Sequence, residues 1–88
     1  MALTITDTLT AINGDTYASV DLWEAAHGPC GVKNAAYVTS GTLTLDEGGV
    51  SVTRVLVYPD EAKREAHEAS AIGITKTWNF VNISRVTD

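Results

Sequence analysis

Two histidines and a single cysteine are the side chains of this sequence best suited to chemistry. His27 and Cys30 stand three residues apart, Glu24 precedes His27 by the same spacing, and His67 could join them in the folded chain. Imidazole, thiolate and carboxylate groups together can bind zinc, but structural zinc signals combine two ligand pairs and this chain has one. We therefore predict no metal site. We interpret His27 and Cys30 as loop residues, with Cys30 a small buried hydrophobic side chain.

Cys30 is also a candidate nucleophile. A reactive thiolate needs a base, for which His27 or His67 could serve, and surroundings that lower its pKa, such as a helix start. The Pro-Cys-Gly context of Cys30 predicts no helix start. The acidic residues of 60–68 are expected on a solvated helix face, and the glycines at 48–49 lack the lysine of a phosphate-binding loop. The sequence thus predicts no catalytic residues, no enzyme activity and no cofactor.

The composition predicts a single folded domain over residues 1–88. Hydrophobic residues make up 44% of the chain and charged residues 19%, which is too apolar for a disordered chain. The net charge is −5 and the six basic residues are scattered, whereas nucleic-acid binding needs a clustered cationic surface. We therefore predict no nucleic-acid partner. The N-terminal segment has neither a basic start nor an unbroken apolar stretch, so we expect no signal peptide and no membrane partner.

Threonine alternates with apolar residues in short segments, which is typical of strands with one wet face. Residues 3–11 show this pattern, and Asp7 interrupts their apolar face, which predicts a break or bulge nearby. Asn13-Gly14 then favours a tight turn. We expect a first hairpin over residues 3–22, with Ala18, Val20 and Leu22 on the return strand.

The middle of the chain predicts an irregular loop followed by a second hairpin. Residues 24–34 contain two glycines and a proline, so no long regular element is expected there. A change of parity at Ser40-Gly41 predicts a bulge. The turn at 46–49 leads into a strand over 50–58, whose last four residues are apolar on both faces. We expect residues 55–58 to be central and covered on both sides.

A helix or helical loop is expected at residues 60–71. Asp60 can cap it, and Gly73 can end it. Ala62, Ala66 and Ala69 form a small-residue stripe that would pack closely against the sheet. On the exposed side, Arg64 can pair with two acidic neighbours, Asp60 and Glu68. Residues 74–86 then predict a closing strand or pair of strands, and the expected core includes Val55, Val57, Trp78 and Phe80.

Together these elements predict a mainly β fold. We expect a small antiparallel β-sandwich or barrel-like domain of about six short strands with one short helix or helical loop at 60–71. The segments 8–14 and 42–48 echo each other, which is compatible with a duplication and with convergence on a common turn. Trp23 and Tyr37 flank the irregular loop, and we predict that they contact a protein partner, because rigid aromatic side chains with a polar tip are favoured at interfaces.

The passage from Val55 to Ala71 consists of a strand ending in Tyr58 and an acidic, Ala- and Arg-rich stretch. It resembles small structural proteins of tailed bacteriophages and prophages. The resemblance implies a β-sandwich or barrel-like subunit that assembles in many copies, as a homo-oligomer or on a capsid or tail protein. It implies a capsid-decorating, neck or tail role in the virion, after synthesis in the cytoplasm of the bacterial host.

A second hypothesis assigns the chain to another class. A small inhibitor encoded by a phage or mobile element could bind a host protein through its acidic surface. Such a complex would be discrete and would weaken with salt, because charge steering is screened.

Overall fold

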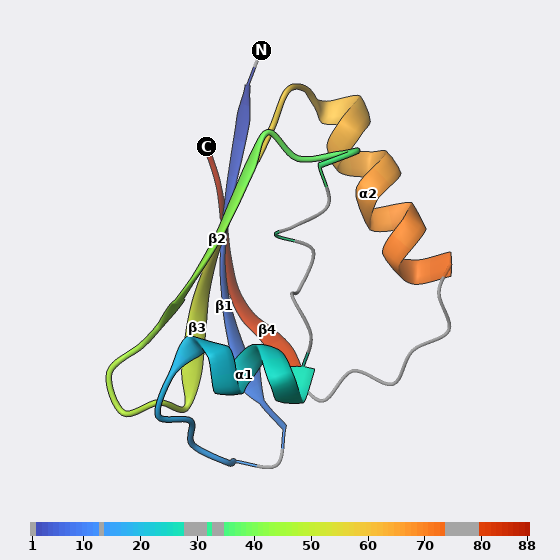
Figure 1. Ribbon diagram of the computed structural model, residues 1–88. Helices are drawn as coiled ribbons and strands as arrows, with labels where there is room; N and C mark the ends of the chain where they lie inside the picture. Colours follow the sequence, from blue (N-terminus) through green and yellow to red (C-terminus); the bar gives the residue numbers. More distant parts are fainter. Residues whose placement is uncertain (1, 13, 28–31, 33–34, 74–79) are drawn as a thin grey trace.

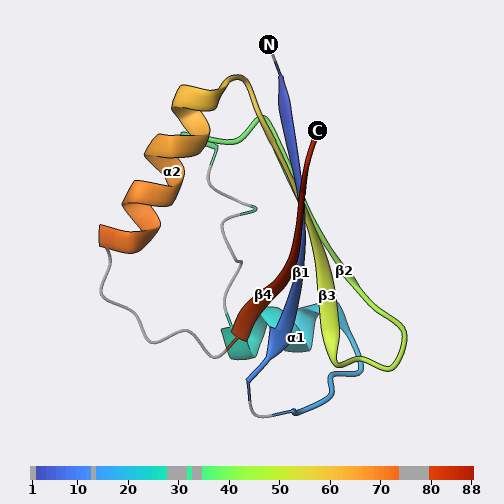
Figure 2. The ribbon, with the colours of Figure 1, turned by 180° about the vertical axis from the view of Figure 1, so that it is seen from behind.

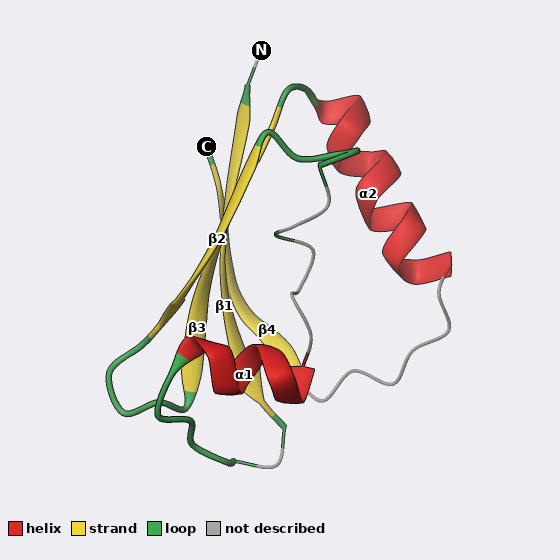
Figure 3. Cartoon of the chain, viewed as in Figure 1, coloured by secondary structure: helices red, strands yellow, loops and turns green. Residues whose placement is uncertain are grey.

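The computed structural model describes residues 2–12, 14–27, 32, 35–73 and 80–88, with only the backbone described for 70–73. Six elements follow one another along the chain (Figures 1 and 3). They are β1 (Leu3–Ala11), α1 (Val20–His27), β2 (Ser40–Leu45), β3 (Ser51–Tyr58), α2 (Glu61–Gly73) and β4 (Phe80–Thr87).

The strands form one antiparallel sheet in the order β2-β3-β1-β4. Because β1 and β2 both run antiparallel to β3, they are parallel to each other, and α1 lies in the crossover between them. By the same reasoning α2 connects the parallel strands β3 and β4 around β1. Two interlocked split βαβ units of this kind make the ferredoxin-like arrangement. Both helices lie on the same side of the sheet (Figures 1 and 2).

The mainly β, antiparallel character of the fold is confirmed, but the described residues form neither six strands nor a second sheet. The second layer of the fold consists of helices. One of them, α1, occupies the segment that was expected to form the return strand of the first hairpin. Ser19 begins this helix: its carbonyl oxygen accepts from the Trp23 N–H at 3.2 Å, and its hydroxyl oxygen accepts from the Leu22 N–H at 3.3 Å. A serine cap and the three-residue spacing of Val20 and Trp23 favour a helix. The prediction of a return strand was therefore wrong.

The second predicted hairpin is confirmed. β2 and β3 are joined by a turn in which Gly48 and Gly49 have φ values of 89° and 70°. The N–H of Asp46 donates to the Ser51 carbonyl oxygen at 2.9 Å. The loop before α1 docks on this turn, since the Tyr17 N–H donates to the Gly49 carbonyl oxygen at 2.8 Å. A Cβ atom on Gly49 would collide with the backbone of Tyr17, so this position requires glycine for both its φ and its surroundings.

The helix after β3 is confirmed with its cap. The Lys63 N–H donates to Asp60 Oδ1 at 2.9 Å, and the helix ends at Gly73. The predicted packing face was wrong, because Ala62, Ala66 and Ala69 are exposed, while His67 is buried. Polar contacts of His67 and Glu68 with side chains of the sheet determine which side of the helix faces it.

The hydrophobic core lies between the helices and one face of the sheet, in two clusters. The first contains Ile5, Val32, Val38, Leu56 and Tyr58, and the second contains Leu9, Ala11, Trp23 and Val52. Val55 and Val57 alternate with these residues, so they point to the other face and are half-buried. β3 is central as predicted, but it is covered on one side only. Phe80 packs against the second cluster, and Trp78 lies outside the described residues.

The break or bulge expected near Asp7 in the strand of residues 3–11 is absent from that strand, and the irregularity lies in its partner β4. The pairing of β1 with β4 shifts between Thr8 and Leu9, because Ile83 is inserted between the two residues of β4 that face them. β1 itself pairs continuously with β3. The bulge expected at Ser40-Gly41 was wrong, since β2 and β3 pair without a shift from Ser40 to Leu45.

Candidate functional site

Asp7 is a fully buried carboxylate on the core face of the sheet, with 0% of its side chain exposed. Its neighbours across the sheet are Arg54 on β3 and Arg85 on β4. Arg54 donates to Asp7 Oδ2 from Nη2 at 2.6 Å and from Nε at 3.2 Å. Arg85 donates from Nε to Oδ1 at 2.8 Å and from Nη2 to Oδ2 at 3.1 Å. The carboxylate thus accepts four hydrogen bonds from two guanidinium groups.

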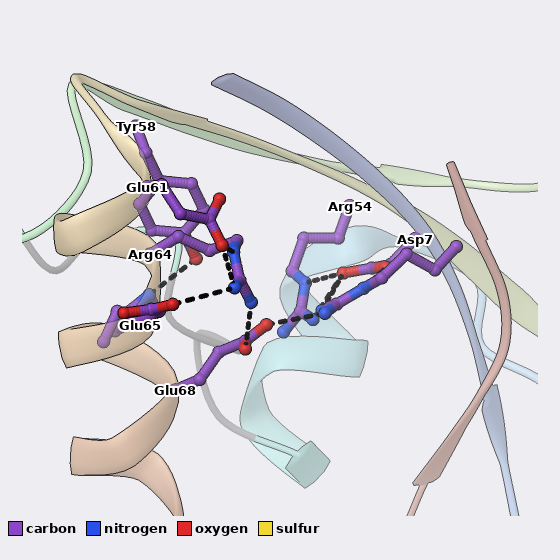
Figure 4. Close-up of polar contacts among 9 residues, drawn as sticks. Asp7, Arg54, Tyr58, Glu61, Arg64, Glu65 and Glu68 are labelled. Atoms are coloured by element: carbon purple, nitrogen blue, oxygen red, sulfur yellow. Dashed lines mark hydrogen bonds and ion pairs between the residues drawn. The ribbon is translucent and has the colours of Figure 1, made fainter. Parts of the chain in front are cut away.

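The charges continue from the sheet to α2 (Figure 4). Glu68 accepts from Arg85 Nη1 at 2.6 Å and from Arg64 Nη1 at 2.5 Å, and Arg64 also pairs with Glu61. Acidic and basic groups therefore alternate from the centre of the sheet to the first turn of the helix. We call these side chains the ion-pair network; they are Asp7, Arg54, Glu61, Arg64, Glu68 and Arg85. The pair expected between the Asp60 and Arg64 side chains is replaced by Glu61.

Hydrogen bonds within the network shift the pKa values of Asp7 and Arg85. Burial alone would raise the pKa of the Asp7 carboxyl, but the hydrogen bonds from Arg85 and Arg54 outweigh it and hold this pKa below its ordinary value. The hydrogen bond to Asp7 and that to Glu68 raise the pKa of Arg85. Asp7 is thus ionised and paired at neutral pH. These contacts fasten α2 to the sheet and β4 to its neighbour β1, and they hold the buried Asp7 carboxylate in its charged form.

His67 is the polar residue through which α2 enters the core. Its Nδ1 shares a hydrogen bond of 2.8 Å with the Tyr58 hydroxyl, and the Tyr37 ring stacks on it with centroids 5.2 Å apart. Burial, with a smaller contribution from Arg54, lowers the pKa of His67, and burial raises the pKa of Tyr58. Both groups are neutral at pH 7. Tyr37 is half-buried, and its predicted role as a partner contact stays a prediction.

The other histidine belongs to an aromatic cluster at the opposite end of the sheet. His27 Nε2 and the Tyr17 hydroxyl are 3.0 Å apart, and Trp23 and Phe80 pack beside them. Trp23 has 0% of its surface exposed, so its predicted role as a partner contact was wrong. The helix turns this ring inwards, to where Leu9 lies under it. His27 is likewise a packed helix residue, and the prediction that it is a loop residue was wrong.

The two histidines that were considered as zinc ligands are not brought together. His27 and His67 lie in the two separate clusters, and Cys30 is outside the described residues. Among the described residues there is no group of three or more histidine, cysteine or acidic side chains that could hold a metal ion.

The face of the sheet opposite the helices carries no charged side chain on any of its four strands. We call it the open face. Cross-strand pairing places these residues on it: Thr4, Thr6, Thr8, Thr10, Ser40, Thr42, Thr44, Ser51, Thr53, Val55, Val57, Val81, Ser84 and Val86. The open face is the solvent-facing, threonine-rich side of the strands that the sequence predicted.

The open face is bounded by polar groups at its ends. Asp46, in the turn after β2, accepts a hydrogen bond from the Thr53 hydroxyl at 2.7 Å. Asp88 pairs through its backbone with Thr4 at the other end. On β4, Val81 and Val86 are exposed on this face, and the bulged Ile83 is 60% exposed. A charge-free area with exposed valines and an acidic rim shares with the core of an interface its depletion of charged residues.

The chain was compared with protein-family models, with curated protein sequences and with solved structures, and no significant match was found. Neither of the two helices in the described part of the chain is long and apolar enough to cross a membrane.

Proposed function

We propose that this protein is a non-enzymatic assembly module that acts through protein–protein contacts. The observation that carries the proposal is the open face. The chain has 17 charged residues, eleven acidic and six basic, and none lies on the fourteen strand positions of this face. A face that only met water would gain solubility from charge, whereas the centre of an interface excludes charge because desolvating it is costly.

The ion-pair network supports the same proposal. The strongest polar cluster of the described chain joins helix to sheet, and its acids are matched with arginines. Active sites typically hold titratable groups at pKa values useful near neutral pH, and a carboxyl whose pKa is lowered further, as for Asp7, is not of that kind.

The class of assembly follows from the resemblance to small structural proteins of tailed phages. We propose a virion subunit in a capsid-decorating, neck or tail position, acting as a homo-oligomer or on the lattice of a capsid or tail protein. A domain of this size buries a modest fraction of its surface, so neighbouring subunits would add to its stability. In this proposal Tyr37 contributes a contact near α2, and Trp23 contributes only to the core.

Co-purification tests the proposal. The tagged chain is expressed with any capsid, neck and tail proteins found to be encoded beside its gene, and complexes are separated by size exclusion with light scattering. We expect self-association or a stable complex with one of the virion proteins, in many copies. A salt-sensitive one-to-one complex with a host protein, without binding to virion proteins, would contradict the proposal and favour the inhibitor hypothesis.

A further inference from the structure

We infer that the open face is covered by a second copy of this chain. Two sheets would stack face to face across a two-fold axis, with the helices outside, so that the pair forms a two-layer β-sandwich. The sandwich expected within one chain would then be made between two. This inference rests on the proposed assembly function and names the partner and the surface that it uses.

The edges of the sheet are less suited to self-association than its face. At the β4 edge the insertion of Ile83 interrupts regular pairing, and the Ser84 N–H already donates to the Asn82 side chain at 3.2 Å. At the other edge β2 has only six residues. Bulges and short outer strands are devices that prevent strand addition. Contact through the face avoids both.

The chemistry of the open face is complementary to itself. A threonine hydroxyl both donates and accepts a hydrogen bond, and its methyl group packs against apolar neighbours, so the same surface can meet its own copy. The hydroxyls of Thr10 and Ser51, 2.7 Å apart, illustrate such pairing within one sheet. Val55, Val57, Val81 and Val86 supply apolar area that a partner would remove from water.

The charge distribution permits this contact although each copy carries a net charge of −5. The ion-pair network and the acidic residues of α2 lie on the opposite side of the sheet (Figures 1 and 4). Two stacked sheets are about 10 Å apart, which already exceeds the Debye length of about 8 Å at physiological salt. The helices are further out still, so repulsion between the charged layers is screened.

The available area reaches the size that a specific dimer needs. Four strands about 4.8 Å apart, of nine, six, eight and eight residues rising about 3.3 Å each, give a flat area of roughly 500 Å². Two copies would bury about 1,000 Å² before the relief of the side chains is added, which is the threshold for a biological interface and typical of weak association. We therefore expect a dimer with a dissociation constant in the micromolar range.

The test introduces a charge at the centre of the open face. Val55→Lys places an ammonium group between its cross-strand neighbours Thr6 and Thr42, where water solvates it in the monomer but not in the pair. Ala66→Lys, at an exposed position of α2 on the other side of the sheet, is the matched control. Sedimentation velocity from about 1 to 200 µM measures association. We expect Val55→Lys to raise the dissociation constant at least about tenfold and Ala66→Lys to leave it unchanged.

A labelling experiment locates the contact independently. In a Cys30→Ser background, Thr6→Cys and Ala66→Cys each provide one thiol, and maleimide labelling is timed at low and high protein concentration. Protection of the thiol at position 6 alone, with circular dichroism unchanged, supports the inference. A dimer that Val55→Lys does not weaken overturns it and leaves the assembly function intact, as does protection of position 6 only by a capsid or tail protein. A chain that stays monomeric at all concentrations and binds no virion protein overturns both.

Discussion

Replacing the buried carboxylate of Asp7 by an amide tests how the sheet and α2 are held together. Asp7→Asn keeps the size of the side chain and removes its charge. Arg54 and Arg85 then face a neutral amide instead of a carboxylate, and the side chain of Arg54 is only 15% exposed. Neither guanidinium can lose its proton, so both stay charged in a partly desolvated position.

The cost of Asp7→Asn follows from burial. Breaking a buried pair by removing one partner costs about 3–5 kcal/mol, because an uncompensated charge remains. Arg85 is 39% exposed and keeps Glu68 as a partner, so its share is reduced by water. We expect a loss of about 3 kcal/mol, against a total stability of roughly 4–13 kcal/mol for a chain of this length.

Urea unfolding followed by circular dichroism measures the loss as a shift of the midpoint at constant slope. Glu65→Gln, which makes the same chemical change at an exposed carboxylate 4.0 Å from Arg64, is the control and should change the free energy of unfolding by less than about 0.5 kcal/mol. Replacing Asp7, Arg54 and Arg85 together by apolar residues of similar size should restore much of the stability. A loss below about 1 kcal/mol in Asp7→Asn would refute the reasoning.

The pH dependence of stability is a second test of the role of Asp7. The pKa of Asp7 is lower in the folded protein than in the unfolded chain, so its stabilising effect is complete above the unfolded value of about 4 and is lost as the pH falls through the folded value. The stability difference between the wild type and Asp7→Asn should therefore shrink below about pH 4. A difference that stays constant on acidification would contradict the assigned pKa direction.

Two further predictions concern the turn at Gly49 and the buried histidine. Gly49→Ala should destabilise the protein by more than about 2 kcal/mol, because the added Cβ atom meets the Tyr17 backbone. Gly48→Ala, where a Cβ atom has nothing within 4 Å, should cost about 1 kcal/mol from its positive φ alone. Equal urea midpoints for the two variants would argue against the docking of the loop before α1 on this turn. His67 has a lowered pKa when folded, so the unfolded chain binds the proton first, and stability should fall as the pH drops below about 6.5. His67→Phe should show a shallower fall than the wild type between about pH 6.5 and 5 in thermal melts, and an unchanged slope would mean that His67 binds its proton equally well in the folded and unfolded states.

Local chemistry made part of the fold predictable. The alternation of threonine with apolar residues gave the strands at 3–11 and 50–58, because β-branched side chains fit a pleated surface whichever partner they meet. The glycines at 48–49 adopt positive φ, and Asp60 caps the helix that follows β3. These features depend on a few neighbouring residues, so a sequence reveals them.

The parts that were missed depend on pairs far apart in the chain. Asp7 looked like an interruption of an apolar face, and only the strand register, which joins it to residues 47 and 78 positions away, shows why a carboxylate stands there. A lone arginine between Val52 and Leu56 was the corresponding signal in β3. The ion pair between Arg85 and Glu68 orients α2 so that Glu68, and not the alanine stripe, faces the sheet. α1 was missed because Ala18, Val20 and Leu22 alternate as in a strand, and the cap at Ser19 was not considered.

The position of β1 in the sheet has a consequence for biosynthesis. Within these 88 residues the strand that is synthesised first, β1, is an inner strand, and its neighbour β4 is the last of the four. Asp7 therefore has Arg54 beside it once β3 has emerged, but receives its second arginine only when Arg85 has been translated. Until then, the nascent domain holds an acid in its interior with half of its final donors. Neutralisation of the domain's interior thus waits for β4, which makes the docking of this strand a late and necessary step in folding.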